Sequence, residues 1–219
     1  MIFPWQLSLS LAGHVARNRL RGRTKYPLVL MLEPTFRCNL ACAGCGRVRE
    51  DRAVGSRMLT VDECLQAAED TGAPVVSIAG GEPLLHPQIG EIVDGLIARK
   101  RFIHLCTNGL LLRDALGESL RPSPYLCIVF HIDGLAHTHD RIAGRKGVFE
   151  CAMSGIESAI AAGYQVRTNT TLYRGTDRVE LLELFGLMCK LGVNGMMVAP
   201  AFSFDAVSDR IFLTREETA

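Results

Sequence analysis

Short apolar runs alternate with amphipathic stretches along most of this chain. The apolar runs are rich in Val, Ile and Leu, which favours strands, whereas apolar positions three or four residues apart favour helices. The predicted strands span residues 26–32, 74–80, 101–107, 125–133, 164–172 and 195–200. The predicted helices span residues 61–71, 88–100, 112–120, 148–162 and 177–191. The order is a strand–helix unit repeated six times.

Residues at the helix ends agree with this pattern. Thr60 is placed to cap the helix at 61–71, and Glu63, three residues later, completes a capping box. Gly163 and Gly192 follow two other helices at the position where a left-handed residue ends a helix. The helix boundaries are therefore predicted by side-chain chemistry as well as by periodicity.

A repeated strand–helix order requires parallel strands with helices outside, in an open sheet or a barrel. We predict an α/β fold, a partial (β/α)6 TIM-like barrel of parallel strands with outer helices, over residues 26–200. Residues 1–25 form an N-terminal segment before the barrel, and residues 201–219 begin a C-terminal extension. "LTREETA" at the end of the chain reads as a capping box that opens another helix, which predicts a truncated chain.

The N-terminal segment, residues 1–25, begins with apolar residues and ends with basic ones. Leu7, Leu11 and Val15 fall on one helical stripe. The basic residues follow the apolar part, whereas a signal peptide places them before it, so we predict no export. The stripe fits a helix packed over the end of the domain or a helix lying in a membrane interface. The second alternative predicts a cytoplasmic enzyme in peripheral contact with the inner membrane surface.

Composition narrows the function further. The chain has 48% hydrophobic and 21% charged residues, as a globular protein does, and its formal net charge of +1 gives no argument for a nucleic-acid partner. No run of apolar residues is long enough for a membrane span. Five cysteines are scattered singly, as in a reducing compartment: Cys64, Cys106, Cys127, Cys151 and Cys189.

The other three cysteines lie close together, in "EPTFRCNLACAGCGR" after the first predicted strand: Cys38, Cys42 and Cys45. A structural zinc site normally takes four protein ligands in two separated pairs, and no second pair is present. A catalytic zinc with three protein ligands and a redox pair of Cys42 with Cys45 remain alternatives. Three thiolates suit a [4Fe-4S] cluster better, because one iron then stays open to a small molecule.

Polar motifs follow the next three strands. "GGEP" begins at Gly80, "CTNG" at Cys106 and "HIDG" at His131. Chemistry in such folds collects beyond the carboxyl ends of the strands, so we expect these motifs to converge with the cysteine loop. Asn169 and Thr171, alternate residues near the end of the fifth strand, are expected to point to the same place.

This order of motifs, CxxxCxxC, GGEP, TNG and HIDG after successive strands, resembles the radical S-adenosylmethionine (SAM) superfamily. The resemblance implies cluster ligands at Cys38, Cys42 and Cys45. It also implies that the amino and carboxylate groups of SAM bind the open iron. One electron then cleaves SAM to methionine and a 5′-deoxyadenosyl radical, so the cofactor does the hard chemistry.

The resemblance also implies residues that bind SAM. Gly80, Gly81 and Glu82 would bind its methionine amine, with glycines because backbone must approach the ligand closely. The position before the third cysteine, often aromatic in the superfamily, is Gly44 here.

The remaining cofactor-binding candidates are Pro83, Asn108, His131, Asp133 and Asn169. His131 and Asp133 would approach the ribose or carboxylate of SAM, or else form a strand-ending turn with a self-bonded aspartate. Asn169 would hydrogen-bond the nucleoside, or else be a buried amide satisfied by neighbouring backbone.

Longer stretches, "YPLVLMLEPTFRCNLACAGCGR", "GGEPLLHPQI", "ARKRFIHLCTNGLLL" and "GMMVAP", resemble the adenosylhopane synthase family of bacterial hopanoid biosynthesis. That resemblance implies addition of the adenosyl radical to the terminal alkene of diploptene, a hopanoid lipid, with SAM as cosubstrate and an external electron donor such as flavodoxin or ferredoxin. Hydrogen abstraction from another substrate is the first alternative, and a zinc-stabilised binding module without catalysis is the second.

The substrate would need a wide apolar cavity. Residues near the last strand are candidates for its lining or for ordinary core: Met196, Met197, Phe202 and Phe204.

Radical addition to an alkene leaves a tertiary radical on the substrate, which a hydrogen atom must quench. Cys106, at the end of the third strand, is our candidate donor because its S–H bond is weak. A cysteine in an apolar strand can also be inert core. Cys127, deeper in the fourth strand, is the weaker candidate.

Overall fold

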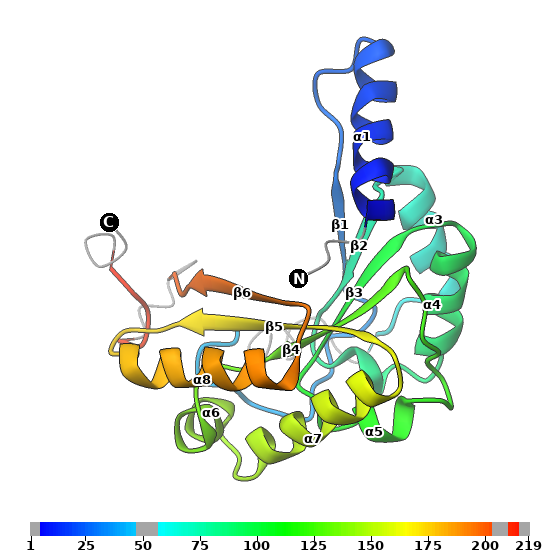
Figure 1. Ribbon diagram of the computed structural model, residues 1–219. Coiled ribbons are helices and arrows are strands. Elements are labelled where there is room, and N and C mark those ends of the chain that lie inside the picture. The colour runs from blue at the N-terminus through cyan, green and yellow to red at the C-terminus, as the bar shows by residue number, and fades with distance from the viewer. Residues whose placement is uncertain (1–4, 47–56, 203–209, 215–219) are drawn as a thin grey trace.

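The computed structural model describes residues 5–46, 57–202 and 210–214. Its six parallel strands form one sheet in the order β1-β2-β3-β4-β5-β6. The strands are β1 (Val29–Leu32), β2 (Val75–Ile78), β3 (Phe102–Thr107), β4 (Leu126–His131), β5 (Gln165–Leu172) and β6 (Gly195–Pro200). The sheet curls into a half-barrel with helices around its outer side (Figure 1), so the predicted partial (β/α)6 barrel is confirmed.

The helices follow the strands in chain order. They are α3 (Val61–Thr71), α4 (Ile89–Ala98), α5 (Leu112–Ala115), α6 (Ala136–Ala143), α7 (Val148–Ala161) and α8 (Arg178–Leu191), and the 3-10 helix η1 (Pro83–Leu85) lies between β2 and α4. Buried residues of the strands pack against these helices in one core, with Ile103, Ile128 and Phe130 fully enclosed. Alternation along each strand turns the intervening residues, such as Ser77 and Cys106, toward the concave side.

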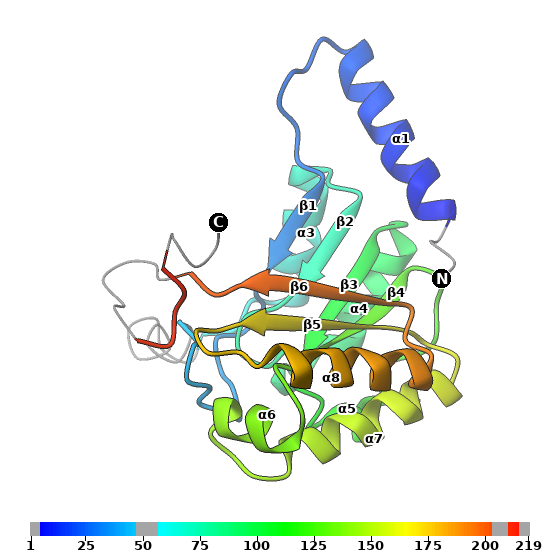
Figure 2. The same cartoon turned by 60° about the vertical axis from the view of Figure 1, so that its left-hand side comes forward.

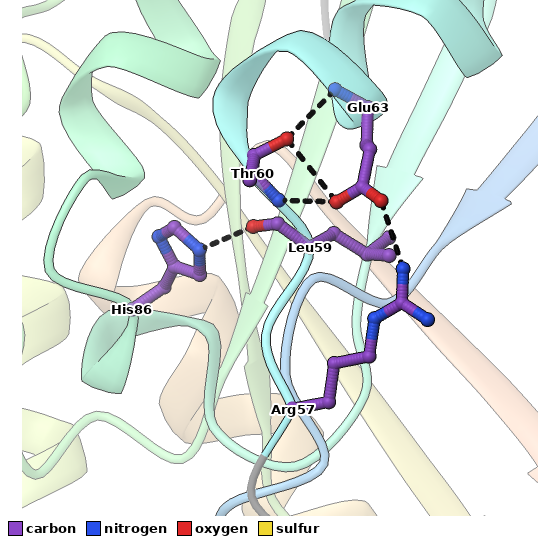
Figure 3. A network of polar contacts seen from close by, with 5 residues as sticks. All are labelled: Arg57, Leu59, Thr60, Glu63 and His86. Atoms are coloured by element: carbon purple, nitrogen blue, oxygen red, sulfur yellow. Dashed lines mark hydrogen bonds and ion pairs between the residues drawn. The ribbon is translucent and has the colours of Figure 1, made fainter.

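The start of α3 has the predicted capping box (Figure 3). The Thr60 hydroxyl accepts a hydrogen bond from the Glu63 backbone, and the Glu63 carboxylate accepts one from the Thr60 backbone at 2.8 Å. His86 Nε2 lies 2.8 Å from the carbonyl oxygen of Leu59, and Gln88 N donates to His86 Nδ1. Nε2 of this buried histidine therefore holds the end of η1 against the segment before α3, and Nδ1 fixes the turn that leads into α4.

Two features of the helices differ from the prediction. The helix expected at residues 112–120 ends at Ala115, because Gly117 adopts a left-handed φ of 82° and its N–H bonds the carbonyl of Leu120. Helix α6 was not predicted, since its sequence is mostly polar; His139, Ile142 and Ala143 nevertheless form its buried face.

Helix α1 (Trp5–Leu20) covers the opposite end of the sheet from the polar motifs. Leu7 is buried against Val75 and Phe102, the first residues of β2 and β3, and Leu11 packs beside them. Beyond this contact the helix extends away from the strands (Figures 1 and 2). Its predicted stripe thus packs on the domain at the first turns. None of the helices in the described part of the chain is long and apolar enough to span a membrane.

Candidate functional site

A cavity of about 390 Å³ opens at the carboxyl ends of the strands. The loops after β1, β2 and β3 and the last residue of β4, His131, all line it, which is the predicted convergence. Predicted site residues in its lining are Cys38, Cys42, Cys45, Gly80, Gly81, Glu82, Cys106, Asn108 and His131. The structure therefore brings together nine candidates that are spread over residues 38–131.

The cysteine loop is a short turn held by backbone hydrogen bonds. Cys45 N donates to Cys42 O at 3.1 Å, and Ala43 N donates to Ile142 O at the end of α6 at 2.8 Å. Cys38 is exposed, and the other two cysteines are half-buried. Within the described ranges, no three His, Cys, Asp or Glu side chains are grouped closely enough for one metal ion. Three thiols around one cavity fit a cluster, in which each thiolate binds its own iron, better than a single zinc ion.

Burial raises the pKa of the Cys42 thiol to about 12, and the nearby Cys45 and Cys38 thiols add to the shift. Burial likewise raises the pKa of Cys38. Both thiols are thus neutral at physiological pH, so a metal centre that binds them must displace their protons.

The two glycines of the GGEP motif pack against the segment that leads to the cysteine loop. Gly81 N donates to Thr35 O at 2.9 Å, and Glu82 N donates to Arg37 O at 2.8 Å. A side chain at Gly80 would collide with the Thr35 carbonyl, and one at Gly81 with the Arg37 carbonyl. The close backbone approach that demands glycine is therefore made to this segment, and a ligand is not needed to explain it.

Glu82 is almost fully buried and joins the GGEP turn to the end of β3. Its carboxylate accepts hydrogen bonds from Thr107 Oγ1 at 2.9 Å, Asn108 N at 2.9 Å and Leu84 N at 3.2 Å. Burial raises its pKa, although these three bonds oppose the shift. Pro83 is buried at the start of η1 and does not line the cavity.

Asn108 joins the same turn to the cysteine loop. Its side-chain nitrogen donates to Asn39 Oδ1 at 2.7 Å, and its Oδ1 accepts from Leu110 N at 3.0 Å. The GGEP turn, the TNG turn and the cysteine loop are thus tied to one another by polar side chains.

His131, at the end of β4, and Asp133, just after it, form a bonded pair. His131 Nε2 lies 2.7 Å from Asp133 Oδ2. Asp133 is buried, does not line the cavity, and accepts a hydrogen bond from Thr171 N at 2.7 Å. Burial lowers the pKa of His131, but the charge and hydrogen bond of Asp133 raise it more, so the net shift is upward. Asp133 thus contacts His131 within its own motif and is also bonded to Thr171 of the neighbouring strand.

Of the other residues predicted to line the cavity, some do and some do not. Thr171 and Phe202 line the cavity, whereas Asn169, in register with His131, does not. Met196 packs against the core, and Met197 is exposed. Phe204 lies outside the described residues.

Several lining residues were not predicted: Leu40, Tyr173, Ala201 and Phe212. The Tyr173 ring lies directly against Gly44, where a side chain would clash with it. Tyr173 follows β5, so its place at the carboxyl end of a strand is the one sequence signal that could have pointed to it.

Cys106, the second-last residue of β3, lines the cavity. Its Sγ lies 3.8 Å from Ser77 Oγ, and burial raises its pKa. Cys127 is buried and is not in the cavity lining.

Comparisons with known proteins agree on one family. The family model described as "Radical SAM superfamily" matches residues 32–188. The "AdoMet-dependent heme synthase" of Methanosarcina barkeri is 34% identical over 174 residues, which cover 77% of this chain and 49% of that protein. The subtilosin biosynthesis protein AlbA of Bacillus subtilis is 29% identical over 210 residues, or 92% of this chain and 45% of AlbA. The chain thus spans about half the length of these curated relatives.

A solved structure has the same fold. SuiB of Streptococcus suis, in a crystal structure bound to S-adenosylmethionine, superposes with a TM-score of 0.74 and 22% sequence identity. The match covers 93% of this chain and 47% of SuiB.

Proposed function

Because the chain belongs to the radical SAM superfamily, whose cofactors are a [4Fe-4S] cluster and SAM, we propose that it adds the 5′-deoxyadenosyl group of SAM to the terminal alkene of a hopanoid such as diploptene. One observation carries the proposal: three thiols and a separate fourth thiol, Cys106, line the same cavity. The first three suit a cluster and the fourth suits the quenching of a substrate radical. The resemblance of several long stretches to adenosylhopane synthases supports this choice of substrate.

The cluster would be held by Cys38, Cys42 and Cys45. When bound there, the cluster and SAM supply a 5′-deoxyadenosyl radical by one-electron cleavage of the sulfonium. The loop that carries the cysteines is fixed from three sides, by the GGEP turn, by Asn108 and by α6. A rigid loop keeps the reaction centre at one place in the cavity, which is what positioning of a reactive group requires.

SAM would lie along the loops after β2, β3 and β4. Gly80, Gly81 and Glu82 would offer backbone groups to its methionine part, with Pro83 fixing the turn. Asn108 and His131 reach the same cavity, and Asp133 would set the orientation of the His131 ring through their 2.7 Å contact. Asn169 lies outside the cavity lining, so it would hydrogen-bond the nucleoside of SAM only where SAM extends beyond these lining residues.

Part of the cavity lining is apolar. Leu40, Ala201, Phe202 and Phe212 contribute apolar side chains to the lining. Apolar walls with a few convergent polar groups are typical of small-molecule sites, and a hydrocarbon substrate would find apolar contacts there.

Cys106 would donate the hydrogen atom that ends the reaction. Its S–H bond would break and a C–H bond would form on the substrate carbon, which leaves a thiyl radical that one electron and one proton must restore. The raised pKa keeps Cys106 in the S–H form that can donate. Its place in the cavity wall supports this role over that of Cys127, which lies outside the lining.

Anaerobic incubation with SAM, a reductant and diploptene, followed by mass analysis of all adenosyl products, tests the proposal. We expect a saturated adenosylated hopanoid. Free 5′-deoxyadenosine as the main product, with unchanged diploptene, would contradict the addition and favour hydrogen abstraction.

A further inference from the structure

A groove of about 480 Å³ lies on α6 and the turn after it, outside the cavity described above. Three exposed cationic side chains line it: Arg141, Arg145 and Lys146. His137, also exposed, lies at its edge. Throughout the described ranges, none of the three cations forms an ion pair with a carboxylate. The groove therefore offers its positive charge to solvent.

The one acidic residue in the groove lining is Asp140, and its carboxylate is already used. Its oxygens accept hydrogen bonds from Gly147 N at 2.6 Å and Phe149 N at 2.9 Å, at the start of α7. Asp140 thus holds the turn that displays Arg145 and Lys146, and does not neutralise them by contact.

The groove touches the cysteine loop. The Ile142 carbonyl accepts a hydrogen bond from Ala43, between Cys42 and Cys45, and the Gly144 backbone packs on the Ala41 carbonyl. Since neighbouring Cα atoms are about 3.8 Å apart, the backbone of Arg145 lies within about 10 Å of this loop. Figure 2 shows the loop after β1 passing beside α6.

A cluster on this loop needs an electron from outside the chain, because no second redox centre is among the described residues of the site. Electron-transfer complexes are small and transient, and opposite charges steer the two proteins together. We propose that the Arg141–Arg145–Lys146 groove is the docking surface for a small acidic electron-carrier protein. This inference rests on the proposed function, since it assumes a cluster held by the cysteine loop.

An anionic membrane surface would also attract cations, but the groove lacks what membrane binding needs. Interfacial binding buries Trp, Phe or Leu side chains among the lipids, and the groove lining contains only Ala136 and Gly144 beside its polar residues. The exposed Trp5, Leu9 and Leu20 lie on α1, at the other end of the sheet.

The test compares two double charge reversals. R141E/R145E changes the groove, and R17E/R19E makes the same change in net charge on exposed positions of α1. SAM cleavage is followed as 5′-deoxyadenosine release, once with a reduced flavodoxin as donor at low and high salt, and once with dithionite.

With flavodoxin at low salt, we expect R141E/R145E to be at least about fivefold slower than the wild type, with a weaker dependence on salt. With dithionite, which is small and needs no docking surface, the two should agree within about twofold. R17E/R19E should match the wild type with both donors. If R141E/R145E folds poorly, K146E, outside any helix, should give the same pattern with a smaller effect.

Equal rates with flavodoxin for the wild type and R141E/R145E would overturn the inference. So would an equal loss in R17E/R19E, which would mean that net charge alone matters. Binding of the wild type to anionic vesicles that R141E/R145E abolishes, with flavodoxin rates unchanged, would assign the groove to a membrane. No cleavage by the wild type with dithionite would instead refute the proposed function.

Discussion

The two ends of the half-barrel are built from the same parallel strands but differ in what they display. At the carboxyl end, the segments that follow the strands surround a cavity, and buried polar groups such as Glu82, Thr107 and Asp133 hold these segments together. At the amino end, Leu7 of α1 closes an apolar contact with Val75 and Phe102. The side chains at the carboxyl end therefore form a site, whereas those at the amino end stabilise the fold.

The largest effect is expected from the cysteine loop. Cys42→Ala should abolish cluster assembly and SAM cleavage, because the two remaining thiolates can hold only a damaged cluster. Cys151→Ala, an exposed position on α7, is the matched control and should keep wild-type cleavage. Iron content and 5′-deoxyadenosine release measure both. Full cleavage by Cys42→Ala would place the chemistry elsewhere.

Cys106→Ala should keep its cluster and cleave SAM, yet lose the saturated product. Without the thiol, the substrate radical loses its proposed hydrogen donor, so alkene-containing or abortive adducts should accumulate. Mass analysis of the lipid products checks this, with Cys127→Ala as the control that retains the saturated product. A normal yield of saturated adenosylhopane from Cys106→Ala would point to an external hydrogen donor.

A change at the amino end should affect stability and spare the chemistry. Leu7→Ala should lower the free energy of unfolding by about 2 kcal/mol, the low end of the range for buried leucines, because its cluster is small. Denaturant unfolding measures the loss. SAM cleavage per folded molecule should be unchanged; a parallel loss of cleavage would mean that the two ends are coupled.

The smallest effect concerns the basic residues of α1. If α1 brings the enzyme to its lipid substrate, R19Q should weaken binding to anionic vesicles about fivefold at low salt, since one charge contributes about 1 kcal/mol near such a surface. Co-sedimentation measures it. Equal binding by both proteins, or none by the wild type, would leave α1 as a cover for the strand ends.

Local sequence patterns predicted most helices and strands of the half-barrel. The strand Gly195–Pro200 and the helix Val61–Thr71 were predicted at their observed bounds, because local periodicity defines the first and the Thr60–Glu63 box the second. The helix that begins at Leu112 was predicted to run to residue 120 but ends at Ala115, because Gly117, which reverses the chain, interrupts an otherwise helical pattern only once.

The site was predicted where residues carry a motif and missed where packing places them. The cysteines, GGEP and Cys106 were found by their spacing and strand position. Tyr173 reaches Gly44 across more than a hundred residues, so no local pattern marks it. The need for glycine at Gly80 and Gly81 was predicted, but its cause, contact with the Thr35 and Arg37 carbonyls, depends on three-dimensional packing.

The central claim is that the carboxyl-end cysteine loop carries a cluster with one iron open to SAM. Electron paramagnetic resonance of the anaerobically reconstituted and reduced protein, with iron and sulfide analysis of the same sample, tests it most directly. We predict about four iron and about four sulfide per chain, and a reduced-cluster signal whose line shape changes when SAM is added. Stoichiometric zinc without sulfide, or a cluster signal that SAM does not alter, would contradict the account.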